Sequence, residues 1–477
     1  MNRSLLFHWF FSRNHFAKAL ACCNSPNDVR SSKVLYACYR LGMYKTVTSS
    51  SPGDGHSRGS FARAISLAAC GREVEAAAIT RKLSAESNNA QLSSGLAIAL
   101  APFAPELALE LLEGFNAPAD LRAALLLRVG RNEQATAVLH QATQVSRAGQ
   151  FSELSLLLSN ATPAPPVSQL KQMNTFLTAH TLTPLTLLDE ANAPGPMNLT
   201  SAVEHTPVRG PLVTILMTAF NAAQRIVPAI SSLMAQSYRD IEIIVIDDAS
   251  TDDTGKVVQA LAVADSRIVY IRLPRNVGTF VAKSVGLRHA RGEFVMCHDS
   301  DDWSHPLRIE RQVRPLITKR EVVFTTSNWV RMQDDGIYYA RPVNPLMRFN
   351  PASPMFRKVL VQERAGGWDP VRTGADSEFA ARLMLVFGQR ASHRVAQPLA
   401  FGAHRPGSLM TAVDTGYSTS GMSPTRLDYW ESWNHHHIAE LRAGRLPYVS
   451  PNLLEKRRFA APPEIIVPCE DIEVCLG

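Results

Sequence analysis

The alternation of short apolar runs with amphipathic stretches after Pro211 constrains the fold more than any other feature of this sequence. The apolar runs are suited to strands, and they cover residues 213–217, 241–246, 268–273 and 293–297. The stretches between them have the apolar spacing of helices, and they cover residues 222–236, 254–265 and 281–290. Strands that alternate with helices at this spacing are typical of βαβ units. We therefore predict an α/β domain with a doubly wound, mostly parallel sheet.

A second body precedes this domain and is predicted to be all helical. From Lys33 to about Val145 the apolar residues recur at helix spacing. Three of the apolar helices are closed by Gly42, Gly71 and Gly130, a residue type that ends helices in a left-handed conformation. Gaps of 29 and 59 residues resemble a tetratricopeptide-like repeat of helix pairs. An ordinary helical bundle fits the pattern equally well, so both interpretations remain open.

Changes in composition divide the chain into five segments. Residues 1–60 form a basic N-terminal segment that ends in a Ser/Gly/Pro linker over residues 46–60. Residues 61–161 form the helical domain, and residues 162–210, with seven prolines, form an extended connector. Residues 211–415 form the α/β domain. A C-terminal extension, residues 416–477, is expected to cover the ligand side of that domain or to dock the N-terminal helices.

The charge distribution excludes a chain-wide nucleic-acid surface. The formal net charge is +7, but the first 60 residues hold eight basic and two acidic residues, so the rest is nearly neutral. Apolar residues 5–11 predict either a packed first helix or a helix that lies on a membrane surface. This run is too short for a transmembrane helix and lacks the features of a secretory signal. Seven unevenly spaced cysteines indicate neither a disulfide framework nor a zinc site, which favours the cytoplasm.

Acidic residues gather where the second and fourth predicted strands end. Asp247 and Asp248 follow one strand, and Asp299, Asp301 and Asp302 follow the other. Ligands of such sheets bind at the carboxyl ends of the strands, so we expect these loops to meet. Carboxylates this close raise one another's pKa unless a cation lies among them. Oxygen ligands of this kind favour Mg²⁺ or Mn²⁺, although each loop taken alone could be a solvated turn.

Several ordered motifs make residues 211–411 resemble a family 2 glycosyltransferase with the GT-A fold. The matching text is VTILMTAFN (213–221), QSYRDIEIIVIDDASTDDT (236–254), Asn276-x-Gly278, ARGEF (290–294) and DSDD (299–302). The resemblance covers about 40% of the chain. It implies a sugar-nucleotide donor, which Thr218, Asn221 and Asp248 would hold. It places Lys283 near the diphosphate, Asp299 at the ribose, and Asp301 and Asp302 nearest the metal.

The resemblance also implies a general base. Gly366-Gly-Trp-Asp369 precedes Gly374-Ala-Asp-Ser-Glu378, and this aligns Asp376 with the base of the family. A helix-capping role for Asp376 is the alternative, and Glu378 is the reserve base. His404 matches a histidine that approaches the metal or diphosphate, but a structural role is equally open. Packing is favoured for Trp303, and the adjacent histidines 435–437 are not expected to share one metal.

We therefore predict an inverting, metal-dependent glycosyltransferase that uses a nucleoside-diphosphate sugar and a glycan or lipid-linked acceptor. Bacterial surface polysaccharide synthesis is the expectation at family level. The basic N-terminus predicts peripheral contact with the inner face of the membrane, and the helical domain predicts a protein partner. Two alternatives are a non-catalytic scaffold with a degenerate transferase domain and a sugar nucleotidyltransferase. The second needs a glycine-rich loop, which residues 218–221 lack.

Overall fold

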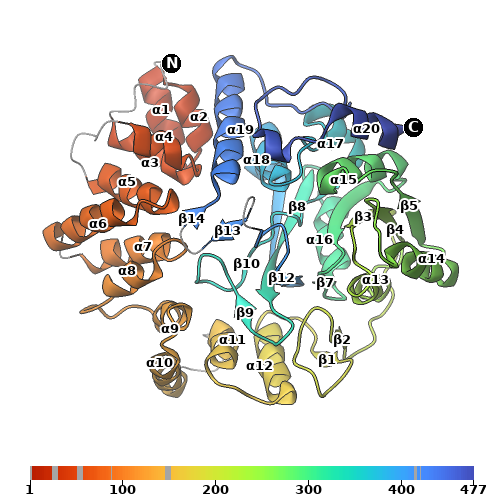
Figure 1. Ribbon diagram of the computed structural model, residues 1–477, viewed down its shortest axis with the longest axis horizontal. Helices are drawn as coiled ribbons and strands as arrows, with labels where there is room; N and C mark the ends of the chain where they lie inside the picture. Colours follow the sequence, from red (N-terminus) through yellow and green to blue (C-terminus); the bar gives the residue numbers. More distant parts are fainter. Residues whose placement is uncertain are drawn as a thin grey trace.

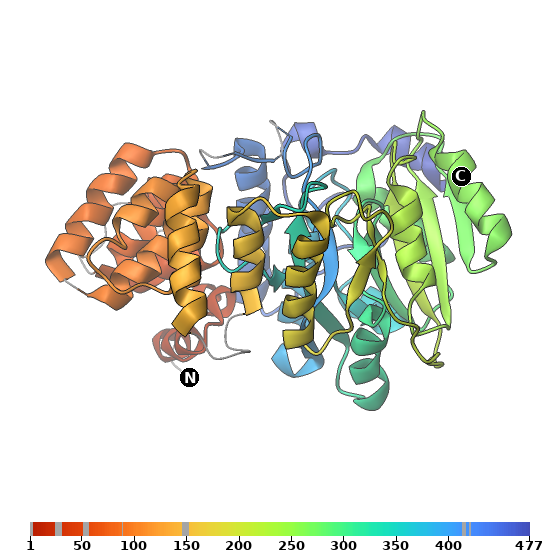
Figure 2. The same cartoon turned by 90° about the horizontal axis from the view of Figure 1, so that it is seen from below.

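The computed structural model describes residues 3–23, 31–50, 57–87, 89–145, 152–412, 416–418 and 421–477. Helices α1 to α12 form an arc along one side of an α/β body (Figures 1 and 2). The helices of the arc are α1 (Arg3–Ser12), α2 (Phe16–Ala21), α3 (Ser32–Arg40), α4 (Tyr44–Ser49), α5 (Ser57–Ala69), α6 (Glu73–Ser87), α7 (Ala90–Leu100), α8 (Pro105–Glu110), α9 (Ala119–Arg128), α10 (Asn132–Val145), α11 (Ser152–Ala161) and α12 (Pro166–Ala179).

The main sheet confirms the predicted α/β class. Its strands follow the order β5-β4-β3-β6-β11-β8-β12-β7, and only β11 and β7 run against the others. The short strands β9 and β10 pair with β8. The bounds are β3 (Val213–Ala219), β4 (Ile241–Asp247), β5 (Ile268–Arg272), β6 (Phe294–Asp299), β7 (Trp303–Ser304), β8 (Phe324–Met332), β9 (Tyr338–Tyr339), β10 (Arg348–Phe349), β11 (Met355–Arg357) and β12 (Ser392–Ala403).

Helices cover both faces of this sheet, which makes it doubly wound. On one face α13, α14 and α16 pack against Val213, Ile215 and Met217 of β3. On the other face α15 and α18 pack against Leu216 of β3 and its neighbours. The bounds are α13 (Ile226–Met234), α14 (Thr254–Ala264), α15 (Gly278–His289), α16 (Arg308–Thr318), α17 (Lys358–Arg364), α18 (Ala375–Phe387) and the 3₁₀ turn η1 (Gln389–Ala391). Burial on both faces explains why these strands read as continuous apolar runs.

The glycine punctuation predicted for the helical body has the expected geometry. Gly42, Gly71 and Gly130 have φ values of 75°, 76° and 76°. After each of them, the next backbone N–H donates to a carbonyl five residues back, as in Arg72 to Leu67 and Arg131 to Leu126, both 2.9 Å. These are Schellman caps, which turn the chain sharply from one helix to the next. The helices α3, α5 and α9 thus each pair with the helix that follows.

Two segments differ from the sequence predictions. Within the expected linker 46–60, residues 46–49 belong to α4 and residues 57–60 belong to α5. Val47 is buried, and Gly59 packs closely against Ser32. Residues 51–56 lie outside the described part. The expected extended connector contains α12 and a hairpin of β1 (Leu185–Leu187) and β2 (Leu199–Ser201). Pro166 is the first residue of α12, where a missing N–H costs no helical hydrogen bond.

The C-terminal extension docks the N-terminal helices. It contains β13 (Tyr417–Ser418), β14 (Gly421–Met422), α19 (Pro424–Arg442), η2 (Pro463–Ile465) and α20 (Cys469–Leu476). Helix α19 lies between the helical arc and α18 (Figure 1). The indole N–H of Trp430 donates to the carbonyl of Leu41 at 2.7 Å, and Gly42 leaves no room there for a side chain. Among the described helices none is both long and apolar enough to span a bilayer.

Candidate active site

Polar residues join three segments of the site: the loop after β3, the loop after β4 and the turn that precedes α15. The buried Asp248 carboxylate accepts the backbone N–H groups of Val277 and Gly278 at 2.7 and 2.8 Å. Asn221 is exposed, and its side-chain oxygen accepts the N–H of Thr251 at 2.9 Å. The structure thus places both predicted nucleotide residues at the carboxyl edge of the sheet and gives each a role in fixing loop geometry. Burial raises the pKa of Asp248, against the opposing effect of the two amides.

Thr218 lies at the end of β3, level with Asp299 in the neighbouring strand β6. Its hydroxyl is 2.8 Å from the hydroxyl of Thr279, in the first turn of α15. The sequence motifs did not identify Thr279. Its position directly after the Asn-x-Gly turn, which the motif fixes, is the signal that points to it.

The buried Lys283 forms an ion pair with the partly exposed Asp299 at this edge. The ammonium nitrogen lies 3.4 Å from the Asp299 carboxylate, and the Lys283 side chain is only 5% exposed. Burial alone would lower the pKa of Lys283, but the carboxylates of Asp299 and Asp376 outweigh it and raise the pKa. Lys283 is therefore a permanent positive charge in the site. The same charge lowers the pKa of Asp299 against the opposing effect of burial.

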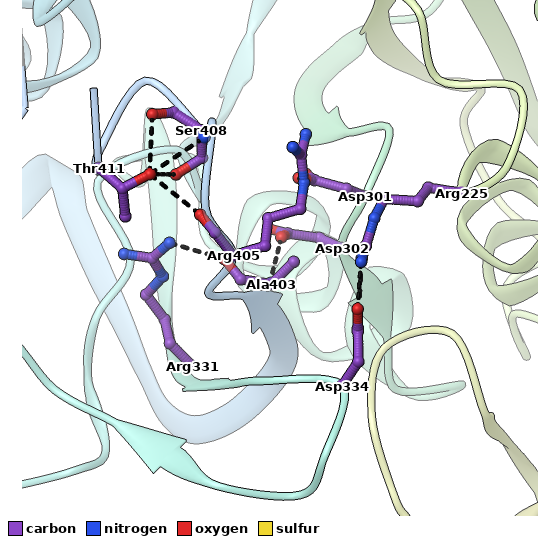
Figure 3. A network of polar contacts seen from close by, with 9 residues as sticks. All are labelled: Arg225, Asp301, Asp302, Arg331, Asp334, Ala403, Arg405, Ser408 and Thr411. Carbon is purple, nitrogen blue, oxygen red and sulfur yellow. Dashed lines mark hydrogen bonds and ion pairs between the residues drawn. The ribbon is translucent and has the colours of Figure 1, made fainter. Parts of the chain in front are cut away.

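Asp301 and Asp302 have different partners, although they are adjacent (Figure 3). Asp301 accepts the Nε–H of Arg405 at 2.9 Å. Asp302 is buried and accepts the backbone N–H of Ala403 at 2.9 Å. Burial and the neighbouring carboxylates raise the pKa of Asp301, and they raise that of Asp302 well above its ordinary value. This pair is therefore short of positive charge.

The residues fit a divalent cation that takes few ligands from protein. The described residues contain no group of three or more His, Cys, Asp and Glu side chains arranged to hold a metal. Mg²⁺ commonly takes only one or two carboxylates, and substrate phosphates and water supply its other ligands. Two undercompensated carboxylates on one loop match that pattern. Asp301 and Asp302 are the residues that would hold the ion.

His404 lies beside this pair, and its ring stacks on Tyr339. The two ring centroids are 3.6 Å apart and the planes differ by 1°. Burial first, and then the charges of Arg331 and Arg128, lower the pKa of His404 to about 4, so its imidazole is neutral at pH 7. Its buried Nδ1 has no hydrogen-bond partner among the residues that the structure describes. A neutral imidazole is the form that binds a metal, so both interpretations of His404 stay open in the structure.

Asp376 lies in the first turn of α18, close enough to Lys283 to favour the charged form of the lysine. Together with Lys283 and Cys297 it lines a small cavity that Trp368 and Phe379 wall off. Gly374 precedes the helix with a φ of 87°, and Tyr429 of α19 packs against it. Asp376 accepts only the N–H of Ser377, at 2.8 Å, among the hydrogen bonds found in the described residues. Its carboxylate is thus placed at a helix N-terminus, where negative charge is favoured.

Glu378 is not available as a reserve base. Its side chain is fully buried and makes two 2.7 Å hydrogen bonds with Arg382. His437 of α19 adds a third contact at 2.9 Å. Burial would raise the pKa of Glu378, but Arg382 and His437 outweigh this effect and hold the pKa at about 2. This carboxylate holds α18 in place.

The remaining aromatic and histidine predictions concern packing. Trp303 is 3% exposed and packs on Phe401, as expected. The three adjacent histidines point to separate partners: His435 to Thr46, His436 to Phe459 and His437 to Glu378. Such divergence is what the helical geometry of adjacent residues predicts.

Two arginines of the site were missed in the sequence. Arg405 follows His404 and reaches Asp301, and Arg372 binds Asn276 through a 2.7 Å hydrogen bond. Arg372 therefore joins the Asn-x-Gly turn to the segment that leads into α18. The available signal was their position, because Arg405 directly follows His404 and Arg372 lies two residues before Gly374.

Comparison with known proteins identifies the domain that carries this site. Residues 214–374 match the model of the glycosyl transferase family 2. This part of the chain is a family 2 glycosyltransferase domain. The matched residues carry Thr218, Asp248, Lys283 and Asp299–Asp302, whereas Asp376 in α18 and the segment after β12 with His404 and Arg405 lie beyond the match.

The relatives are bacterial and match over the same part of the chain. An uncharacterized glycosyltransferase of Haemophilus influenzae is 33% identical over 126 residues, which is 26% of this chain and 50% of that protein. An Escherichia coli UDP-Glc:α-D-GlcNAc-diphosphoundecaprenol β-1,3-glucosyltransferase, WfaP, is 33% identical over 134 residues, 28% of this chain and 52% of that one. This chain thus spans about half the length of these relatives. The succinoglycan biosynthesis protein ExoO of Rhizobium meliloti is 40% identical over 103 residues, 22% of this chain and 29% of that one.

Two solved structures are similar in part. Staphylococcus aureus TarS 1-349 in complex with UDP-GlcNAc aligns with a TM-score of 0.34 and 18% identity, over 41% of this chain and 59% of that one. The mannosyltransferase PcManGT of Pyrobaculum calidifontis, in complex with GDP-Man and Mn²⁺, aligns with a TM-score of 0.34 and 18% identity. That alignment covers 54% of this chain and 70% of the other.

Proposed function

We propose that this chain transfers a sugar from a nucleoside-diphosphate sugar to a hydroxyl of a glycan or lipid-linked acceptor, with inversion at the anomeric carbon. The single observation that carries the proposal is the convergence of Lys283, Asp299 and Asp376 in the family 2 domain. A buried, permanently charged lysine lies between an acidic loop suited to a nucleotide and a carboxylate suited to a base. Sugar transfer from a diphosphate needs these three functions in one place.

The donor would lie across the carboxyl edge of the sheet. Thr218, Asn221 and Asp248 border the nucleotide side, and Asp299 is placed for the ribose. Lys283 would face the diphosphate, where negative charge grows as the bond to the sugar breaks. A positioned charge in a water-poor site stabilises such a transition state, and this is commonly the largest catalytic contribution. A divalent cation held by Asp301 and Asp302 would neutralise further charge on the same leaving group when bound.

Asp376 would remove the proton from the acceptor hydroxyl. Within the described part of the chain its carboxylate makes one hydrogen bond, from the N–H of Ser377 to Oδ1, which leaves Oδ2 to accept a hydrogen bond from an acceptor hydroxyl. Attack from the face opposite the diphosphate is a single displacement and inverts the anomeric configuration. Lys283 is paired with Asp299 and lines a small cavity together with Asp376, so its charge would act on both the donor side and the acceptor side of the site.

The biological setting follows from the relatives and the N-terminal helices. WfaP and ExoO are named for a lipid-linked acceptor and an exopolysaccharide, which supports a role in bacterial surface polysaccharide synthesis. We place the protein in the cytoplasm, with α1 touching the inner face of the membrane where such acceptors are found. The helical arc offers a surface for a protein partner.

Replacing the base tests the proposed activity. Purified protein is incubated with Mn²⁺ and a panel of UDP-, GDP- and dTDP-sugars, and nucleotide release is measured with and without sugar acceptors. We expect one donor class to be turned over. Asp376→Asn should reduce transfer by about 10²–10⁴-fold, which is the usual contribution of a general base, while nucleotide binding is kept.

The matched control is Asp253→Asn. Asp253 is also an acidic residue at the start of a helix, α14, but it is exposed and paired with Lys256. This variant should turn over like the wild type. Near-normal turnover by Asp376→Asn would refute the assignment of the base. A protein that binds and turns over none of the donors would instead be the scaffold predicted as the alternative.

A further inference from the structure

The acidic pair Asp301 and Asp302 is attached to the segment after β12 in two unequal ways (Figure 3). Asp302 is bound to the backbone of that segment, through the N–H of Ala403. The carbonyl of Ala403 is bound in turn by Arg331 at 2.6 Å. Ala403 is therefore fixed on both sides, and Asp302 with it.

Asp301 is bound by a side chain instead. The Nε of Arg405 is 2.9 Å from its Oδ2, and Arg405 is 36% exposed. Within the described residues, Asp301 is the only hydrogen-bond or ion-pair partner of the Arg405 guanidinium. The Arg405 side chain can thus leave without breaking any other polar contact, because its backbone is held separately by the hydroxyl of Thr411 at 3.0 Å.

A second arginine adds to the positive charge but does not bind Asp301. Arg225 lies close enough to favour the ionised form of Asp301, yet its guanidinium is paired with Asp334. Figure 3 shows Asp301 between the two arginines. Arg405 thus occupies the carboxylate oxygen that a cation would need, whereas Arg225 contributes only positive charge from a distance.

We propose that Arg405 and the divalent cation compete for Asp301, and that the diphosphate of the donor resolves this competition by drawing Arg405 onto itself. A guanidinium forms charge-assisted hydrogen bonds with phosphate oxygens as readily as with a carboxylate. Once Arg405 moves to the diphosphate, Asp301 is free for the cation. The inference rests on the proposed function, because it assigns a diphosphate to the site.

Such an exchange makes the two ligands cooperative. Metal without nucleotide must displace Arg405 from Asp301, so it binds weakly. A bound nucleoside diphosphate removes the free-energy cost of displacing Arg405, so the metal then binds more tightly. By linkage, the metal must strengthen nucleotide binding by the same factor. A protein without Arg405 should bind metal more tightly on its own and lose most of this cooperativity.

The experiment measures Mn²⁺ binding by titration calorimetry and by the electron paramagnetic resonance signal of free Mn²⁺, with and without UDP or GDP. Arg405→Gln should bind Mn²⁺ alone about tenfold more tightly than the wild type, within the range of typical coupling between sites. The strengthening of Mn²⁺ binding by the nucleotide should shrink by a similar factor. Neither readout depends on turnover.

Arg225→Gln is the matched control, since it removes one positive charge near Asp301 without removing a bond to it. We expect Arg225→Gln to raise the Mn²⁺ affinity less than Arg405→Gln does. Equal effects of the two variants, or unchanged Mn²⁺ affinity in Arg405→Gln, would overturn the competition between Arg405 and the cation. A wild type that binds neither nucleotide nor Mn²⁺ would count against the proposed function itself and the inference with it.

Discussion

Lys283 is the residue on which the electrostatics of the site depend. It is buried, lies 3.4 Å from Asp299 and faces Asp376 across a small cavity. Without its charge, the carboxylates on either side would be left in a poorly solvated place without a cation. In the proposed mechanism, this one ammonium group would serve both the donor diphosphate and the surroundings of Asp376.

Replacing Lys283 with methionine keeps most of the buried volume and removes the charge. We expect Lys283→Met to lower kcat by about 10²–10³-fold, the usual effect of losing one group that stabilises transition-state charge. Steady-state kinetics on the preferred donor would measure this loss. Lys256→Met, on the exposed face of α14, is the control and should retain the wild-type kcat. A Lys283→Met protein with a kcat within a few-fold of the wild type would remove Lys283 from the mechanism.

Residue roles could be predicted from sequence where a motif fixes both the residue and its strand. Thr218, Asp248 and Asp299 follow strands that the apolar runs located to within a residue or two, so their meeting at one sheet edge was predictable. Arg405 and Arg372 were not, because their partners lie 104 and 96 residues away in the chain. An arginine's partner depends on tertiary packing, and local pattern does not encode it.

Among the secondary-structure elements, α18 and α19 decide where the base lies. The Glu378, Arg382 and His437 side chains join the two helices in a buried cluster. Arg382 also binds the carbonyls of Ala365 and Gly367, which lie in the segment before α18. Helix α18, which carries Asp376 in its first turn, is therefore tied by Arg382 to the segment before it.

Arg382→Leu should destabilise the protein by about 3–5 kcal/mol, the usual cost of leaving one partner of a buried ion pair without the other. Urea unfolding, followed by tryptophan fluorescence, would measure the change in free energy. The double variant Glu378→Leu/Arg382→Leu removes both charges and should recover a large part of the loss. If the single and double variants were equally stable, the uncompensated charge of Glu378 would not be the cause.

The ends of the helices that are closed by a glycine were also predictable, whereas the secondary structure of the connector was not. Gly42, Gly71 and Gly130 determine a local backbone conformation, so a short pattern is sufficient to place them. The proline-rich segment 162–210 reads as extended, yet Met173, Phe176 and Leu177 are buried against the helical body and make α12 a helix. Burial of this kind is a property of the tertiary fold and overrides local composition.

On the scale of the whole molecule, α19 connects the helical arc to the catalytic site. One side of α19 binds the arc, where Glu431 accepts the hydroxyl of Thr46 at 2.6 Å. Its other side contacts α18 through His437, and Tyr429 donates to Asp369 at 2.9 Å. The arc and the α/β domain are therefore joined through α19 into one body, which connects the arc to the helix that carries Asp376.

The first helix of that body has an exposed apolar face. Six of the ten residues of α1 are apolar, but only Phe7 is buried, and Leu5 and Trp9 remain 63% and 46% exposed. The described residues 3–23 and 31–50 contain six basic side chains and no acidic one. An apolar face on a basic background fits the surface of an anionic membrane.

We expect the protein to co-sediment with vesicles of phosphatidylethanolamine and phosphatidylglycerol, and less so with neutral phosphatidylcholine. Leu5→Glu/Trp9→Glu should weaken this binding at least about tenfold, because burying one large apolar side chain contributes about 1.5–3 kcal/mol and each tenfold corresponds to about 1.4 kcal/mol. Added salt should weaken the binding further by screening the basic residues. Val263→Glu is the control, since Val263 is a 90% exposed apolar residue on α14, away from the helical arc. Unchanged co-sedimentation of the double variant would show that α1 does not anchor the protein, and the exposed face would then belong to a protein partner.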